Sequence, residues 1–191
     1  EKVKKFSDLI LKRYELKILD FKKKENIRPY IDDMFNLLEK TYGNLQTFVP
    51  IQKYQIAEYR KKYFQFIHPD LIKCVVDKNN NLIAFCITMP SFTKALKKAN
   101  GKLFPLGYLF LYKALKFNNR ASFYLIGVHP KYQNKGVTAI LFNEMQKSFN
   151  RNGFKIVETN PELEENSSIQ NLWKNYKHRQ HKKRVTVTKK I

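Results

Sequence analysis

The chain has 191 residues, which is enough for one domain with a substantial core, and its 37 Lys and Arg against 16 Asp and Glu give a formal net charge of +21. Its longest apolar stretch, residues 103–112, is shorter than the roughly 20 residues that a membrane-spanning helix needs, and no leader of cationic, apolar and small residues is present. We therefore expect a cytoplasmic protein without a transmembrane segment. Because the chain begins at Glu1 rather than Met, a piece of a longer product is an open alternative.

The excess of positive charge has two interpretations. It suits an anionic partner, such as nucleic acid, an anionic membrane or an acidic substrate. Lys spread over many elements, in a chain also rich in Asn, Ile, Phe and Tyr, is also what an AT-rich coding bias produces, and we favour this second interpretation. The sequence lacks the alternating aromatic and basic strands, or the recognition helix, of a nucleic-acid binder, so we expect no specific nucleic-acid partner.

Hydrophobic spacing predicts the elements of the first part of the chain. Residues 2–13 form an amphipathic helix, and residues 14–21 alternate enough for a strand. Residues 29–42 form a helix with Pro at its start and Gly after its end. A further helix follows Pro50 and ends before His68.

Two apolar runs, residues 71–76 and 82–89, flank a polar turn and predict a hairpin. The expected pairs are Asp77 with Leu82, Cys74 with Phe85, and Lys73 with Cys86. In this register the two thiols point to opposite faces of the sheet. We therefore expect no disulfide, and neither cysteine lies in a metal-like spacing.

The rest of the chain begins with a long insert, residues 90–120, that contains a Lys-rich helix and an apolar segment. After it we expect a strand at 122–128, a helix to 152, a strand at 155–159, a helix at 166–176 and a strand at 184–190. The element order is β-α-α-β-β-(insert)-β-α-β-α-β, which predicts an α/β fold with a mixed central sheet flanked by helices.

The connection after the strand at 123–128 carries the most information about function. A strand, a turn and a helix N-terminus bring free N–H groups together, and the helix dipole favours negative charge there. Gly136 has no Cβ, so a phosphate can approach its backbone closely. An ordinary strand–turn–helix connection is the alternative.

The spacing Gln-x-x-Gly-x-small in this connection resembles the acyl-CoA pyrophosphate loop of the GNAT N-acetyltransferase superfamily. The chain offers Gln133, Gly136 and Thr138, and Thr departs from the Gly or Ala of the family pattern. The element order from about Tyr14 onward is also that of the superfamily. The resemblance implies a GNAT-like acyl-CoA N-acyltransferase domain over residues 14–191, with insert 90–120, behind a connector helix at 1–13.

A closer resemblance involves two phrases, Pro130-x-Tyr132-Gln133-x-Lys135-Gly136 and Leu103-Phe104-Pro105-Leu106-Gly107. Together with the long insert they resemble a group of uncharacterised bacterial GNAT-like proteins, in which a second GNAT-like half precedes this one. This resemblance implies a preceding half as a partner but brings no substrate.

The superfamily resemblance implies acetyl-CoA as the acyl-CoA cosubstrate, an amine as acceptor, and no metal. The backbone at Ile126–Val128 would hold the pantetheine arm and the thioester carbonyl, and Lys135 would add charge near the phosphates. The implied cofactor-binding residues are Gly127, Val128, Gln133, Asn134, Lys135, Gly136, Val137, Thr138 and Asn166.

The family's leaving-group acid is a Tyr in Asn-x-x-Ala-x-x-Leu-Tyr, and here the matching run begins at Asn166 and places Trp173 at the Tyr position. Trp is no acid, so water or Tyr176, one helical turn later, protonates the thiolate, or the domain does no chemistry. Glu158 is the candidate base if it faces inward, where burial raises its pKa, and a solvent-facing Glu158 is the alternative. His129 is an alternative base through water.

These residues leave two functions open. One is an acyltransferase whose insert 90–120 covers the acceptor side of the cleft rather than adding a strand to the sheet. The other is a non-catalytic GNAT-like half that serves a structural role or only binds CoA. Trp173 and Thr138 favour the second function, and the otherwise intact loop favours the first.

Overall fold

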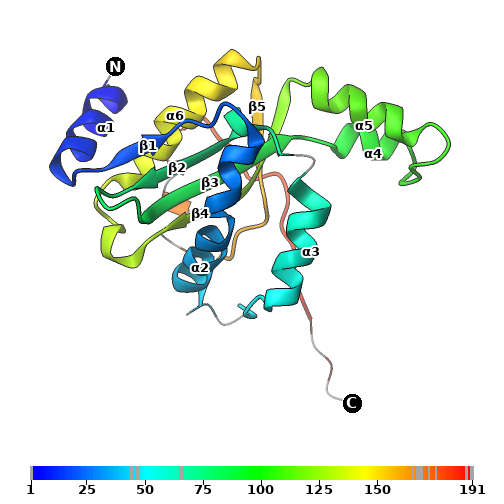
Figure 1. Cartoon of the computed structure of the whole chain (residues 1–191). Helices are drawn as coiled ribbons and strands as arrows, with labels where there is room; N and C mark the ends of the chain where they lie inside the picture. The colour runs from blue at the N-terminus through cyan, green and yellow to red at the C-terminus, as the bar shows by residue number, and fades with distance from the viewer. Residues whose placement is uncertain are drawn as a thin grey trace. The chain divides into compact units, whose positions relative to one another are not determined.

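The computed structural model describes residues 2–43, 45, 48–64, 67–164, 166, 170–171, 173–174, 176–187 and 189. The chain divides into two compact units, Glu1–Glu158 and Thr159–Ile191 (Figure 1). Among the described residues, no helix combines the length and the hydropathy that crossing a membrane requires.

A five-stranded sheet in the order β1-β2-β3-β4-β5 organises the fold. Its strands are β1 Lys17–Leu19, β2 Ile72–Val76, β3 Leu82–Pro90, β4 Arg120–Val128 and β5 Ile156–Thr159. The pairs β1–β2, β2–β3 and β3–β4 are antiparallel. The start of β5 is held at the start of β4, where the N–H of Lys155 donates to the carbonyl of Asn119 at 2.8 Å.

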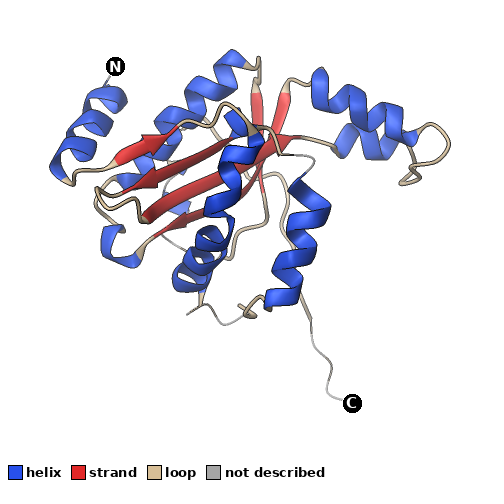
Figure 2. Cartoon of the chain, in the orientation of Figure 1, coloured by secondary structure: helices blue, strands red, loops and turns tan. Residues whose placement is uncertain are grey.

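Helices cover both faces of this sheet (Figure 2). Those that pack on it are α1 Lys2–Arg13 and α6 Val137–Arg151 on one face and α2 Ile31–Tyr42 on the other. The remaining helices are α3 Lys53–Tyr63, α4 Thr93–Lys98 and α5 Gly107–Lys116. Short 3-10 turns occupy Lys24–Tyr30, Pro69–Leu71 and Pro130–Tyr132. The mixed α/β architecture is the predicted one.

Each face of the sheet has its own hydrophobic cluster. One joins Ile10 of α1 and Ile140 of α6 to Val75 of β2. The other joins Met34 of α2 to Cys74 on the opposite side of β2. Because both faces are covered, all five residues of β2 are buried instead of alternating with exposed ones.

The hairpin of β2 and β3 has the predicted pairs Cys74–Phe85 and Lys73–Cys86. Both thiols are free, as expected. The predicted pair Asp77–Leu82 is wrong, because the register shifts between Val75 and Val76 and puts Val76 opposite Leu82. Asp77 instead closes the turn, where its carboxylate accepts hydrogen bonds from the N–H groups of Asn79 and Asn81, both at 2.9 Å.

The two ends of the predicted sheet also differ from the observed one. The strand expected at 14–21 is limited to β1. The strand expected at 184–190 is wrong for residues 184–187, which belong to no strand. The side chains of Val185 and Val187 are 76% and 85% exposed. Their alternation with polar residues therefore does not correspond to a buried face. Part of that segment, like much of the helix expected at 166–176, lies outside the described residues.

Candidate functional site

The final residues of β4 turn half of their backbone groups away from β3. The N–H of His129 donates to the carbonyl of Ile83 at 2.8 Å, and Phe85 lies opposite Gly127. Because hydrogen-bonded and non-hydrogen-bonded pairs alternate in an antiparallel ladder, Gly127 bonds toward β3 while its two neighbours point their N–H and C=O groups to the other side. A Cβ on Gly127 would lie 2.7 Å from the Phe85 ring, so packing alone requires glycine there.

Side chains from outside the strand contact these outward carbonyls. The Tyr42 hydroxyl at the end of α2 donates to the carbonyl of Ile126 at 2.6 Å. The carbonyl of Val128 accepts from the Thr41 hydroxyl at 3.3 Å and from the Gln133 amide at 3.1 Å. Two predicted site residues, Val128 and Gln133, are thus brought together, and Tyr42 joins the site although the sequence analysis did not identify it.

The connection from β4 to α6 is a tight turn with two left-handed residues. After the Pro130–Tyr132 turn, Asn134 has a φ of 58° and Gly136 has a φ of 82°. This geometry directs the chain into α6, whose first residue, Val137, is buried in the core. The predicted residues Gln133, Asn134 and Lys135 are exposed on the outside of the turn.

The first turn of α6 offers unpaired backbone donors. Within residues 129–139, all of which are described, the N–H groups of Val137 and Thr138 donate to no backbone carbonyl. The first turn of α6 also contains no acidic residue. Such a helix start attracts an anion through its N–H groups and its dipole. Thr138, which is half-buried, supplies the second of these two free N–H groups.

Gly136 faces α1 rather than open solvent. A Cβ at this position would lie 2.8 Å from the Phe6 ring and 3.2 Å from Ile10. The positive φ and the packing of α1 therefore each require glycine at this position, independently of any ligand. No sequence pattern indicates this contact, because α1 and the turn are far apart in the chain.

Lys135 lies against two aromatic rings in the same region. Its ammonium is 5.4 Å from the ring centroid of Tyr14 and 5.5 Å from that of Tyr132. The two rings meet edge to face, with centroids 6.1 Å apart. This cation–π arrangement keeps the charge of Lys135 beside the turn while fixing its stem.

The two base candidates in the first unit have different surroundings. Burial and the nearby charges of Lys40 and Lys131 lower the pKa of His129, so its imidazole is neutral at neutral pH. Its Nδ1 accepts a hydrogen bond from the N–H of Lys131 at 3.3 Å, which leaves the proton on Nε2. Glu158, in β5, is half-buried. Its exposure is therefore intermediate between the inward-facing and solvent-facing alternatives of the sequence analysis.

The second unit holds Trp173, at the position where the superfamily resemblance implies a Tyr. The Trp173 indole N–H donates to both carboxylate oxygens of Glu162, at 2.9 and 3.0 Å, and its ring meets Tyr176 edge to face at 6.3 Å. Burial raises the pKa of Tyr176, which keeps its hydroxyl protonated at neutral pH. The carbonyl of Asn166 accepts a hydrogen bond from the N–H of Gln170 at 3.2 Å.

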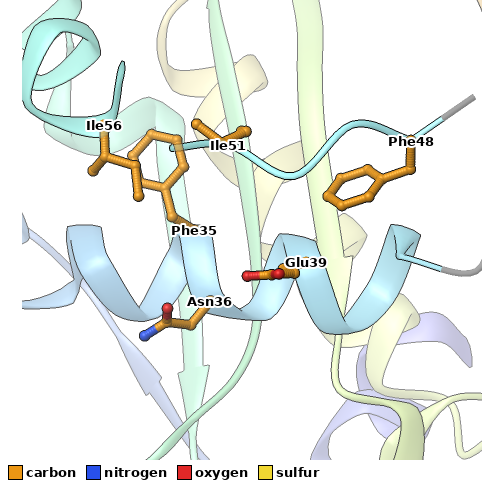
Figure 3. A pocket seen from close by; sticks show the side chains of 6 residues that line it. All are labelled: Phe35, Asn36, Glu39, Phe48, Ile51 and Ile56. Carbon is orange, nitrogen blue, oxygen red and sulfur yellow. The ribbon is translucent and has the colours of Figure 1, made fainter. Parts of the chain in front are cut away.

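Two hollows lie away from the turn. A cavity of about 20 Å³ between α2 and the segment before and at the start of α3 has room for a single water (Figure 3). Its lining residues are Phe35, Asn36, Glu39, Phe48, Ile51 and Ile56. A more open groove of about 300 Å³ runs along β1. Neither hollow is lined by residues of the β4–α6 connection.

Known proteins share both the sequence pattern and the fold of this chain. Residues 31–176 match the family model described as "Acetyltransferase (GNAT) family". Protein YghO of Escherichia coli is 23% identical over 177 residues, and the match covers 89% of this chain but 44% of that protein. The chain therefore spans less than half the length of this relative.

Solved structures show the same fold at low identity. The protein PH1933 of Pyrococcus horikoshii is 14% identical, with a TM-score of 0.61 over 89% of this chain and 92% of that one. An aminoglycoside acetyltransferase from an uncultured soil metagenomic sample, in complex with sisomicin, has 11% identity and a TM-score of 0.57, covering 95% and 99%. AAC(6')-Iy, in complex with the bisubstrate analog CoA-S-monomethyl-acetylneamine, has 11% identity and a TM-score of 0.54, covering 92% and 99%.

Proposed function

The chain belongs to the acetyltransferase (GNAT) family, and we propose that it transfers an acyl group from acyl-CoA, with acetyl-CoA as the donor, to an amine. The observation that supports this most is the start of α6, where the N–H groups of Val137 and Thr138 have no backbone acceptor and no acidic residue stands in the first turn. These groups suit a pyrophosphate.

We assign the donor's anionic part to the turn and the start of α6, Gln133–Thr138, and its pantetheine arm to the outward backbone of β4. Lys135 adds a positive charge beside the turn, and residues 78–143, which include the turn, contain no Asp or Glu. From the sequence pattern we also propose Asn166 as a cofactor-binding residue. The side-chain bonds that Tyr42 and Thr41 make to β4 would keep its outward edge in place.

Acyl transfer from a thioester needs a proton acceptor for the amine and a proton donor for the leaving thiolate. We propose Glu158 as the acceptor, with His129 acting through water as the alternative. For the donor we propose Tyr42 in addition to Tyr176, because the Tyr42 hydroxyl is held at the outward carbonyl of Ile126. Both hydroxyls would supply a proton without needing the family's Tyr at the position of Trp173.

A thiol-release assay tests this function. The purified chain is incubated with acetyl-CoA and a panel of amines that includes aminoglycosides and polyamines, and free CoA is measured. We expect amine-dependent release that falls at least about tenfold in Tyr42→Phe or Tyr176→Phe. Tyr54→Phe is the control, since Tyr54 is 67% exposed on α3. If no amine in the panel increases the release of free CoA, acyl transfer to an amine is contradicted.

The second candidate function is a non-catalytic GNAT-like half that binds CoA or has a structural role beside a preceding half. Trp173 supports it, because it stands at the position of the family's acidic Tyr and cannot give up a proton in its place. Its indole N–H is instead bonded to the carboxylate of Glu162. The packing of α1 against Gly136 supports it too, since α1 adjoins the proposed pyrophosphate turn. CoA binding without turnover would favour this function over transfer.

A further inference from the structure

The insert between β3 and β4 is a helical hairpin of α4 and α5, which we define as the 93–117 hairpin. As expected, it adds no strand to the sheet. Its base is closed by two hydrogen bonds, from the N–H of Ser91 to the carbonyl of Arg120 at 2.9 Å and from the Asn118 amide to the carbonyl of Ser91 at 2.7 Å. Figure 1 shows it projecting beyond the sheet, away from α1.

The two helices of the hairpin pack closely on each other. A Cβ on Gly107, at the start of α5, would lie 1.9 Å from the carbonyl oxygen of Lys102. The ammonium of Lys98 lies 4.7 Å above the ring of Phe110 on the other helix. The N–H of Tyr108 donates to the carbonyl of Leu103 at 3.0 Å. The tip between the helices is therefore a built structure and not a loose loop.

This hairpin exposes large apolar side chains. At its tip, Leu103, Phe104 and Leu106 are 55%, 86% and 58% exposed. Along the helices and at the end of α5 the exposed ones are Leu96, Tyr108, Leu109, Tyr112 and Phe117. An apolar patch of this kind on a projecting element marks a surface that meets another phase or molecule.

The charge of the hairpin is entirely positive. It contains six lysines and no acidic residue: Lys94, Lys97, Lys98, Lys102, Lys113 and Lys116. All six side chains are exposed. Lysines around exposed Leu, Phe and Tyr are the composition of elements that lie in the interface of an anionic membrane.

We propose that the 93–117 hairpin docks on an anionic lipid surface, with Leu103, Phe104 and Leu106 entering the headgroup region and the lysines contacting lipid phosphates. A second copy of the chain is disfavoured, because two all-positive hairpins repel each other. Nucleic acid would pair with the lysines but would leave the apolar tip in water. The proposal goes beyond acyl transfer and does not depend on it.

Flotation with lipid vesicles tests this docking. The purified chain is mixed with phosphatidylcholine vesicles containing about one quarter phosphatidylglycerol, or with pure phosphatidylcholine vesicles, at low salt. We expect strong partition to the anionic vesicles and little to the neutral ones. No partition to anionic vesicles would overturn the proposal.

Two matched pairs of variants separate insertion from simple charge attraction. The tip variant Leu103→Ser/Phe104→Ser should weaken partition at least about tenfold, whereas the control Val49→Ser/Tyr54→Ser, at side chains 77% and 67% exposed, should not. If the tip variant partitions as strongly as the parent chain, the binding comes from charge attraction alone and insertion of the tip is rejected.

The second pair of variants removes three lysines each, one variant from the hairpin and the other from outside it. Lys97→Gln/Lys102→Gln/Lys113→Gln should weaken partition about a hundredfold, and Lys12→Gln/Lys23→Gln/Lys61→Gln clearly less, although the net charge falls equally. Equal effects would assign the binding to net charge and reject the hairpin. Sedimentation of the tip variant gives the last control: a lower assembly mass than that of the parent chain would identify the hairpin as a protein interface and overturn lipid docking.

Discussion

Replacing Asp70 should destabilise the fold through a buried lysine. Asp70 precedes β2, and its carboxylate accepts hydrogen bonds from Lys73 at 3.2 Å, from Ser148 at 3.0 Å and from Asn152 at 2.8 Å, and it pairs with Arg151. The Lys73 side chain is 3% exposed. The Lys73 ammonium has a second carboxylate partner, Asp20, with its Nζ 3.3 Å from Oδ1. Asp70 therefore links the 3-10 turn before β2 to the end of α6.

The size of the effect follows from what remains around Lys73 in Asp70→Asn. Removing one partner of a buried ion pair costs about 3–5 kcal/mol. The Asp70 side chain is 20% exposed and Asp20 still contacts the ammonium, so we reduce the expected loss to about 2–3 kcal/mol. For a chain of this length that corresponds to a fall in Tm of about 4–12 °C.

A double-mutant cycle measured by urea unfolding isolates the pair. Lys73→Met removes the buried charge, so Asp70→Asn should cost at least about 1 kcal/mol less in that background than in the parent chain. Additive effects, or a loss under about 0.5 kcal/mol for Asp70→Asn alone, would refute the reasoning.

The same carboxylate should make stability depend on pH. Burial alone would raise the pKa of Asp70, but hydrogen bonds from Arg151, Ser148, Asn152 and Lys73 outweigh it and hold this pKa well below its usual range. The stabilisation is then complete above the unfolded pKa of about 3.9 and is lost as pH falls toward the folded pKa. Asp70→Asn should lack this part of the acid loss, and an unchanged acid profile would contradict the assignment.

Three further predictions concern the site and the core. Gly136→Ala should lose about 1–2 kcal/mol in urea unfolding, because its φ is 82° and its Cβ would lie 2.8 Å from the Phe6 ring; Phe6→Ala should recover part of this loss, and no loss would show that α1 and the turn are not packed as described. Tyr42→Phe should retain its far-ultraviolet circular dichroism while losing about 1 kcal/mol of stability, since the β4 carbonyl loses its donor; unchanged stability would show that this bond contributes nothing. Burial raises the pKa of Cys74 and takes that of Cys86 to about 12, so neither should react with iodoacetamide at pH 8 until the chain is unfolded; labelling of the folded protein would contradict their burial.

Local spacing predicted most of the fold because the elements are strongly patterned. The Cys74–Phe85 pair followed from two apolar runs of definite length around a polar turn. The pairing at the turn itself failed, since the position of a register shift depends on how Asp77 closes the turn with its own side chain. The strand expected at the C-terminal end failed for a related reason: alternation at Val185 and Val187 says nothing about whether a neighbouring strand exists.

The candidate site was only partly visible in the sequence. Gln133 and Gly136 stood out because their spacing after a strand is characteristic. The bond from Tyr42 to Ile126 joins residues 84 positions apart, and no local pattern on α2 marks it. The packing of Phe6 against Gly136 was equally hidden, since Phe6 reads as one apolar residue of an amphipathic helix.

Calorimetric titration of CoA and of pantetheine into the purified chain tests the central claim most directly. The claim is that the turn Gln133–Thr138 and the start of α6 bind the pyrophosphate of an acyl-CoA. Because the phosphates would be held by backbone N–H groups and the positive end of α6, CoA should bind at least about tenfold tighter than pantetheine, and added salt should reduce the difference. Equal affinities for the two compounds would show that this turn only connects a strand to a helix.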